Sequence, residues 1–321
     1  MARTPSSGSR TSRSKKSSRT SRATPASRRL RGRHSVAQKR AQLRASYRQR
    51  EDLFEIHYLE DKVQLALAAA GTSLFAGEWQ TRLILSDNSE LPVACEWDAA
   101  VWLADEDGDY LELQTHPTEE IRVDRSLFLS RDGGLSFLSD TVISQPVAAE
   151  GGGPQVVALE SSLVLDPGLK ASPVVGGREW QLKSRGFQAR LHSLSSSLPG
   201  ADGVRFEVTD GVLNLRQPCS GGNGFAPVLI DWHPLRARKP AIVKPLTVSE
   251  QRKIVGPATA VASRWQCGTE HLLCYRSLQA PDLARAVLGL HTWYELVLAR
   301  MTKPGTYPPL IQIEAPEEVA K

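Results

Sequence analysis

Residues 127–138 read LFLSRDGGLSFL, and this stretch decides the fold class. Two apolar runs flank Asp132-Gly133 within it. An Asp-Gly pair between apolar runs is a strong hairpin signal, because such turns need residues that tolerate positive φ. The same device recurs at Asp210-Gly211, again between two apolar runs. Both stretches predict antiparallel hairpins, and therefore a chain rich in β-sheet.

Short β-like runs recur along the rest of the chain after Gly71. They alternate in hydropathy or are rich in β-branched and aromatic residues. The runs are residues 81–85, 97–103, 110–114, 156–165, 227–232, 241–248, 258–263, 271–275, 293–298 and 310–313. They predict an all-β protein with a large antiparallel β-sandwich, supersandwich-like, over residues 71–315. Residues 148–154 fit either a linker between two β domains or a loop inside one sandwich, and we favour the loop.

The N-terminal part of the chain is strongly basic. Residues 1–50 contain 16 Lys and Arg and no Asp or Glu, which leaves 24 basic against 35 acidic residues in the remainder. Residues 1–35 are predicted to be a disordered tail, because they have few apolar side chains to offset the entropy lost on ordering. Residues 36–70 are predicted to be a helical segment of one or two helices, the second at Asp61–Ala70.

A polycationic tail binds polyanions mainly through the release of counterions. The candidate polyanion-binding residues are Lys15, Lys16, Arg28, Arg29, Arg31 and Arg33. The partners that fit are nucleic acid, an anionic membrane surface or an acidic polymer, with nucleic acid bound through the tail only. The acidic remainder of the same chain is the alternative partner.

An acidic turn at residues 105–109 joins two of the predicted strands. A five-residue loop there pairs Trp102 with Glu112 and places both on one sheet face with Tyr110 and Asp98. Aromatic rings beside carboxylates suit sugar binding, because rings stack on sugars and carboxylates accept bonds from hydroxyls. This pattern predicts a ligand-binding platform, unless other elements cover that face. The spacing of the acidic turn departs from a Ca²⁺ loop, so no metal site is predicted.

Asp231 and His233 lie two residues apart, so on a strand their side chains point the same way. That arrangement suits proton transfer, and these two residues are the catalytic candidates. An ordinary Asp–His contact at a strand end is the alternative. An enzyme would need a pocket that brings His233 or His116 close to Asp231, Asp140 or arginines. No nucleotide, metalloprotease or serine-hydrolase motif is present, and no cofactor is predicted.

The cysteines and the apolar runs bear on the compartment. Four cysteines are too few for a disulfide framework, which favours reduced and mostly buried thiols: Cys95, Cys219, Cys267 and Cys274. No apolar stretch is long enough for a transmembrane helix, and no apolar region follows the basic N-terminus as in a signal peptide. We expect a cytoplasmic protein, with an organelle transit peptide as the alternative.

The stretch Arg125–Asp140 resembles a recurring strand–turn–strand segment in the β-rich domain of heparinase II/III-like bacterial proteins. There the second strand ends in an acidic residue, as this one does at Asp140, and the approach through Asp107–Leu113 is also similar. The resemblance implies a large antiparallel β-sandwich. In those lyases the sandwich follows an α-helical toroid, and no run of helical pattern here matches one. The chain would then correspond to the β part alone.

Three function classes follow from these patterns. We favour a non-catalytic β-sandwich interaction module, carbohydrate-binding, with a polycationic leader. The first alternative is a heparinase II/III-like polysaccharide lyase-related enzyme acting on acidic polysaccharide. The second is a nucleic-acid-associated protein that binds through its tail.

Overall fold

The computed structural model describes residues 32–46, 51–144, 155–174, 178–195, 203–303 and 305–314. Within these ranges the chain is entirely β, with strands β1 to β26 arranged in four antiparallel sheets. The predicted all-β, antiparallel architecture is confirmed. The described part of the chain holds no helix of the length and apolarity needed to cross a membrane.

The first sheet has nine strands, in the order β1-β2-β3-β4-β5-β11-β16-β15 with β6 also paired to β5. Its strands are β1 (Arg33–Ser35), β2 (Arg40–Arg44), β3 (Leu53–His57), β4 (Gln64–Ala69), β5 (Thr72–Leu85), β6 (Glu90–Pro92), β11 (Val156–Leu165), β15 (Arg205–Thr209) and β16 (Val212–Pro218). The second sheet has eight strands, in the order β12-β13-β14-β17-β10-β9-β8-β7. Its strands are β7 (Asp98–Ala104), β8 (Gly108–Thr118), β9 (Ile121–Ser130), β10 (Leu135–Ser144), β12 (Lys170–Pro173), β13 (Glu179–Ser184), β14 (Phe187–Ser193) and β17 (Gly224–Asp231).

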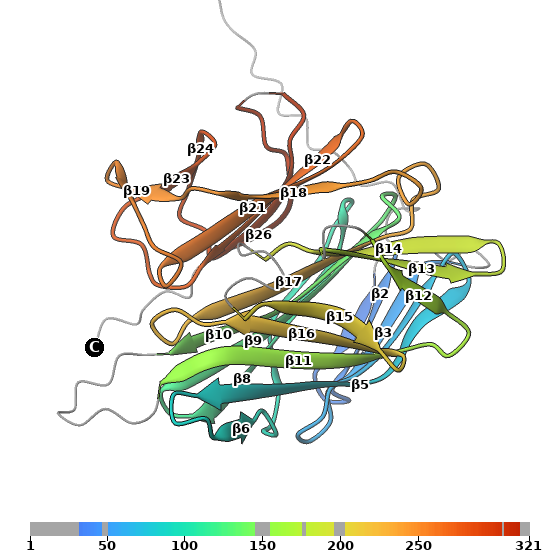
Figure 1. Cartoon of the computed structure of the whole chain (residues 1–321), viewed down its shortest axis with the longest axis horizontal. Coiled ribbons are helices and arrows are strands. Elements are labelled where there is room, and N and C mark those ends of the chain that lie inside the picture. Colours follow the sequence, from blue (N-terminus) through green and yellow to red (C-terminus); the bar gives the residue numbers. More distant parts are fainter. Residues whose placement is uncertain are drawn as a thin grey trace, which may run out of the picture.

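Two smaller sheets come from the C-terminal part of the described chain. The third sheet has five strands: β18 (Ile242–Leu246), β21 (Ala260–Cys267), β22 (Glu270–Ser277), β25 (Leu296–Arg300) and β26 (Pro309–Ile313). The fourth sheet has four: β19 (Ser249–Glu250), β20 (Lys253–Ile254), β23 (Arg285–Val287) and β24 (Leu290–Thr292). Figure 1 shows this orange and red part stacked on the sandwich formed by the first two sheets.

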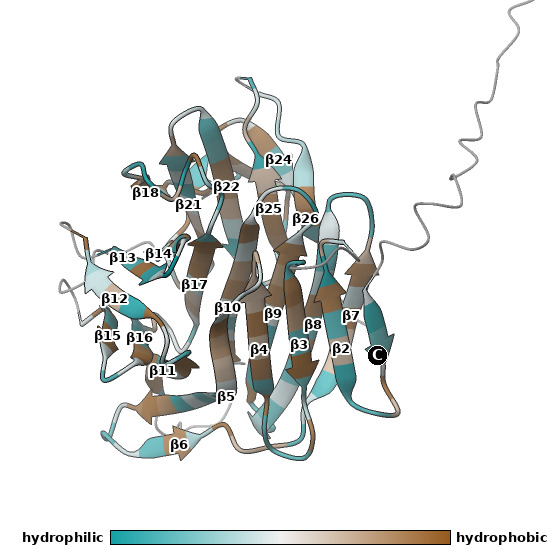
Figure 2. Cartoon of the chain, turned by 90° about the vertical axis from the view of Figure 1, so that its right-hand side faces the viewer, coloured by the Kyte–Doolittle hydropathy of each residue, from teal (hydrophilic) through white to brown (hydrophobic). Residues whose placement is uncertain are grey.

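Three apolar cores separate the four sheets. The first core lies between the first and second sheets, the second core between the second and third, and the third core between the third and fourth. The second sheet is therefore buried on both faces: Leu127 and Leu129 belong to the first core and Phe128 to the second. Figure 2 shows the matching brown, hydrophobic strands in the interior. Burial on both faces fits the consecutive apolar residues of β9 at 127–129.

Both predicted hairpins form. β9 and β10 pair antiparallel around the Asp132-Gly133 turn. β15 and β16 pair with Thr209 opposite Val212, and the two turn residues Asp210 and Gly211 have φ of 52° and 77°. Positive φ at both central residues gives the turn a twist that matches the twist of the two flanking strands.

The helical segment predicted for residues 36–70 is wrong wherever the structure describes it. Those residues form β2, β3 and β4, and alternate side chains such as Leu43, Phe54 and Ile56 enter the first core. The helix-favouring composition was outweighed by burial of one face of each strand, which follows a period of two. The sandwich therefore begins at β1, not at residue 71, in the described chain.

Other predictions fall outside the described residues. The tail over residues 1–31 is among them, and so are five of the six polyanion-binding candidates: Lys15, Lys16, Arg28, Arg29 and Arg31. The sixth, Arg33, is exposed in β1. The segment at residues 148–154 also lies outside.

Candidate functional site

The predicted aromatic platform does not form, because the register of its two strands differs by one residue. β7 and β8 pair Leu103 with Tyr110 and Trp102 with Leu111, around a turn at residues 105–108. A shift of one residue turns side chains to the opposite face. Tyr110 therefore faces the second core, whereas Trp102 packs against the first.

Tyr110 and Glu112 remain together but are buried, whereas Trp102 and Asp98 lie apart from them. The Tyr110 hydroxyl donates a 2.6 Å bond to Oε2 of Glu112, and both residues are buried. The ring of Trp102 lies 5.2 Å from that of His34, between centroids. Asp98 is exposed. The geometry on which the sugar platform depended is thus absent from this region.

Asp231 contacts the backbone of His233 and is paired with an arginine. The buried Asp231 carboxylate binds Arg236 through both oxygens, at 2.9 and 3.0 Å, and accepts a 3.0 Å bond from the backbone N–H of His233. Burial raises the pKa of Asp231, while Arg236 opposes that rise. The Asp231 carboxylate holds the turn after β17. His116 is exposed, whereas Asp140 is buried between the first and second sheets.

The cysteines form no alternative centre among the described residues. All four cysteines are free, and Cys267 and Cys274 are buried. Burial raises the pKa of the Cys274 thiol to about 12. Within the ranges that the structure describes, no three His, Cys, Asp or Glu side chains are grouped so as to hold a metal ion.

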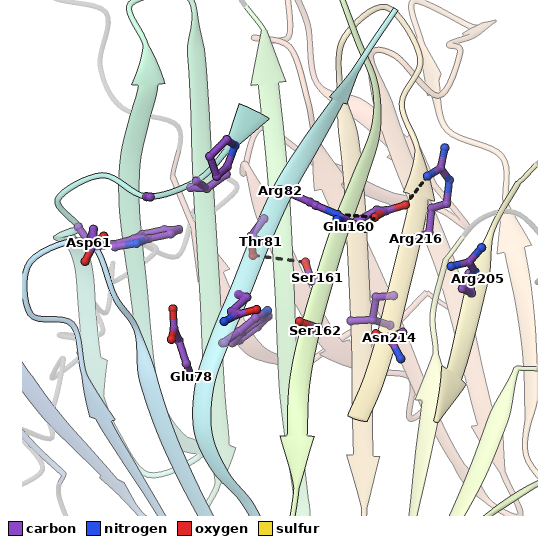
Figure 3. Close-up of a pocket in the computed structure, with 17 residues that line it drawn as sticks. Asp61, Glu78, Thr81, Arg82, Glu160, Ser161, Ser162, Arg205, Asn214 and Arg216 are labelled. Atoms are coloured by element: carbon purple, nitrogen blue, oxygen red, sulfur yellow. Dashed lines mark hydrogen bonds and ion pairs between the residues drawn. The ribbon is translucent and has the colours of Figure 1, made fainter. Parts of the chain in front are cut away.

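A cavity of about 460 Å³ is lined by polar side chains of β5, β11, β16 and β15. Figure 3 shows these side chains across neighbouring strands of the first sheet. Arg82, Glu160, Arg216 and Asn214 project from its outer face, because residues that alternate with them, such as Leu163 and Leu213, belong to the first core. Thr81 and Ser161 also line the cavity, but they face inward and bond Asp140. Residues 92–94 and Trp97 complete the wall. We identify this cavity as the candidate functional site.

A row of charged residues crosses the cavity. Arg82 on β5, Glu160 on β11, Arg216 on β16 and Arg205 on β15 are successive cross-strand partners. Neighbouring strands are about 4.8 Å apart, so the row spans about 14 Å. Three guanidinium groups and one carboxylate therefore lie side by side. We call these four residues the arginine row.

Glu160 is the counter-ion at the centre of the arginine row. Its Oε2 accepts a 2.7 Å bond from Nε of Arg82, and its Oε1 is paired with Nη1 of Arg216. Burial alone would raise the pKa of Glu160, but the hydrogen bonds and charges of the two arginines outweigh burial and lower it. Glu160 is therefore ionised at neutral pH.

Arg205 and Arg216 form a like-charge pair directly across two strands. Like charges directly opposite each other destabilise a sheet. Arg205 is 57% exposed, and its Nε lies 3.5 Å from the half-exposed Glu207. An external anion bound between these two guanidinium groups would reduce their mutual repulsion and form charge-assisted hydrogen bonds with both.

A second, uncharged row lies beside the arginine row. Gln80, Ser162 and Asn214 are cross-strand partners on the same three central strands. Their amide and hydroxyl groups both donate and accept hydrogen bonds. We call them the neutral row. Asp61 and Glu78 also line the cavity, so three carboxylates and three arginines surround it (Figure 3). The site thus combines arginines that can bind an anion with groups that match sugar hydroxyls.

A buried network supports the floor of the site. The Asp140 carboxylate receives bonds from Nε of Arg125 at 2.9 Å, from the Thr81 hydroxyl at 2.7 Å and from the Ser161 hydroxyl at 2.5 Å. Thr81 and Ser161 belong to β5 and β11, the strands that carry Arg82 and Glu160. The network therefore fixes the strands beneath the arginine row.

The guanidinium of Arg125 is also enclosed by aromatic rings. It lies 4.1 Å from the ring centroid of Trp79 and 4.7 Å from that of Trp97. Both rings line the cavity, and both are almost completely buried. Because Arg125 occupies the space between them, the two tryptophans serve as a rigid floor.

Sequence reasoning missed the arginine row. Its alternation is visible in residues 212–218, where Asn214 and Arg216 alternate with leucines. The partners of Arg216, however, come from positions 82, 160 and 205, and one sequence does not show which strands are neighbours.

Comparison with known proteins places the fold but not the site. No protein-family model matches the chain, and no curated protein matches it in sequence. Among solved structures, the heparan sulfate lyase HepC from Pedobacter heparinus is 10% identical with a TM-score of 0.54, covering 77% of this chain and 42% of that one. A heparinase III structure is 11% identical with a TM-score of 0.55, and the coverage is again 77% and 42%.

The chain thus spans 42% of the length of the heparinases that it matches. At 10–11% sequence identity, the structural similarity to these proteins shows a shared fold. It confirms the predicted resemblance to a heparinase-like β-sandwich.

Proposed function

We propose that this chain is a non-catalytic β-sandwich module that binds an acidic polysaccharide across the outer face of its first sheet. The observation that carries the proposal is the adjacent, like-charged pair Arg205 and Arg216 in the cavity. Guanidinium groups bind carboxylates and sulfates with two parallel hydrogen bonds, which gives both strength and geometry. An anionic group between these two arginines would relieve their repulsion.

The size and polarity of the site favour a sugar chain over a small anion. The cavity of about 460 Å³ lies within the usual range of ligand sites. The neutral row runs beside the arginine row and offers partners for hydroxyl groups. The proteins of similar fold include one named for its action on heparan sulfate, which is an acidic polysaccharide. That similarity supports the ligand class without assigning it.

The state of Glu160 favours binding over catalysis. A general base works best when its pKa lies near the working pH. The pKa of Glu160 is instead lowered by the two arginines that hold it. The central carboxylate of the site is therefore a weak proton acceptor.

The test is a calorimetric titration of the full-length protein with size-defined heparan sulfate fragments. The basic tail would contribute its own binding, so all ten Lys and Arg of residues 1–31 are changed to Gln in a common, tail-neutral background: Arg3, Arg10, Arg13, Lys15, Lys16, Arg19, Arg22, Arg28, Arg29 and Arg31. In that background, Arg205→Ala and Arg216→Ala should each weaken binding by about tenfold or more, since a hydrogen bond to a charged group contributes about 1.5–3 kcal/mol. Arg185→Ala is the matched control, because Arg185 is exposed in the turn between β13 and β14.

Two outcomes would overturn the proposal. Unchanged affinity in both cavity variants would show that the site does not bind the polysaccharide. Release of unsaturated uronic acid products, abolished by Arg216→Ala, would show a lyase instead of a binding module.

Binding of duplex DNA that disappears in the tail-neutral background would assign nucleic-acid binding to the tail alone.

A further inference from the structure

The three arginines of the arginine row are not neutralised equally. Arg82 is paired with Glu160 on one side and with Glu90, at 3.0 Å, on the other. Arg216 shares the same Glu160 carboxylate. At the far end, Arg205 is approached by Glu207 at 3.5 Å, and both of these side chains are about half exposed. Arg82 thus has two carboxylate partners, whereas Arg216 shares one and Arg205 has one at 3.5 Å, so ion pairing is weakest at Arg216 and Arg205.

Glu160 also restricts where a ligand anion can lie. Its side chain is only 14% exposed and is bonded on both sides, so it cannot swing out of the row without breaking two ion pairs. An anionic group placed over Arg82 would lie about one strand spacing, roughly 5 Å, from this fixed negative charge, whereas one held between Arg216 and Arg205 lies farther away, between about one and two strand spacings. Like charges at such a distance in a partly buried site repel strongly, and this repulsion is a common source of specificity.

We infer that Glu160 is a charge-selectivity residue, which limits the site to one anionic group at Arg205 and Arg216 and leaves the rest of the sugar chain to the neutral row. The inference rests on the proposed function. The expected ligand is therefore an acidic polysaccharide of low charge density. Such a chain has hydroxyl groups at the positions where a densely sulfated chain has additional anionic groups. Gln80, Ser162 and Asn214 are the groups that would bind those hydroxyls.

The experiment compares two polysaccharides of equal length in the tail-neutral, full-length background at one fixed ionic strength. Hyaluronan fragments carry one carboxylate per disaccharide, whereas heparin fragments carry several anionic groups. The measured quantity is the ratio of the two dissociation constants, heparin over hyaluronan. Glu160→Gln keeps the shape of the side chain and removes its charge. It should lower the ratio by about tenfold, because the repulsion acts only on the additional anions.

Glu90→Gln is the matched control. Glu90 also pairs with Arg82, but it does not line the cavity. Removing either carboxylate changes the net charge equally, so a general electrostatic effect would shift the ratio in both variants. We expect the ratio to change only in Glu160→Gln. Thermal unfolding of each variant confirms that it is folded before titration.

The outcomes separate this inference from the proposed function. If Arg205→Ala and Arg216→Ala weaken binding but Glu160→Gln leaves the ratio unchanged, the binding site stands and the selectivity role is wrong. An equal change in Glu90→Gln would also refute the selectivity role. If neither arginine variant affects binding, the proposed function itself fails.

Discussion

Asp140→Asn should strongly destabilise the sandwich, because it breaks a buried ion pair beneath the candidate site. The Asp140 carboxylate is fully buried and accepts four hydrogen bonds, two from Arg125 and one each from Thr81 and Ser161. Asparagine keeps one carbonyl oxygen but turns an amide donor toward groups that are themselves donors. Arg125 would remain charged, enclosed by two tryptophan rings. Removing one partner of a buried pair costs about 3–5 kcal/mol.

The assay is urea unfolding followed by circular dichroism, with the free energy of unfolding extrapolated to water. Arg125→Met and the double variant complete a double-mutant cycle. The double variant should be less destabilised than the sum of the two single changes, by about 1–3 kcal/mol, since it no longer buries an unpaired charge. A loss below about 1 kcal/mol in Asp140→Asn, or strict additivity in the cycle, would refute this account.

Two further predictions concern the second sheet. Asp124 is buried against Arg276, and burial together with the nearby Glu112 raises its pKa to about 6. The folded protein then holds a proton that the unfolded chain releases near pH 3.8, so stability should fall as the pH rises from about 4 to about 6. Urea unfolding across that range should show this slope, and Asp124→Asn should flatten it; identical slopes would contradict the assignment. Gly108→Ala would place a Cβ 2.6 Å from the backbone oxygen of Leu129 and should cost about 1–3 kcal/mol through overpacking. An unchanged melting temperature in this variant would show that the hairpin end can shift freely.

Much of the fold follows from short-range signals in the sequence. The turns at Asp132-Gly133 and Asp210-Gly211 define hairpins because the chemistry that makes them lies within a few residues. The helix predicted over residues 40–57 was wrong because that prediction, too, relied on short-range signals. Their local composition favours a helix, and only the first core, built from distant strands, selects the strand form.

The candidate site was less accessible to sequence reasoning. The alternation of Trp102 and Tyr110 was visible, but a loop one residue shorter than assumed reversed the face of one strand. The arginine row depends on strand order, which brings positions 82, 160, 216 and 205 together. Nothing local to Glu160 indicates that two arginines flank it. Pairing between strands far apart in the chain is set by the packing of the whole sandwich.

The place of Arg205 at the edge of the first sheet bears on the solubility of the protein. β15 ends the order of that sheet among the described strands, and an edge strand can recruit a strand from another molecule. Charged side chains on edge strands discourage such association, and Arg205 and Glu207 are the charges on β15. In the proposed site, one arginine would therefore serve both as a ligand contact and as protection against aggregation. Lysine at position 205 would keep the protective charge while losing the paired hydrogen bonds that an anion needs.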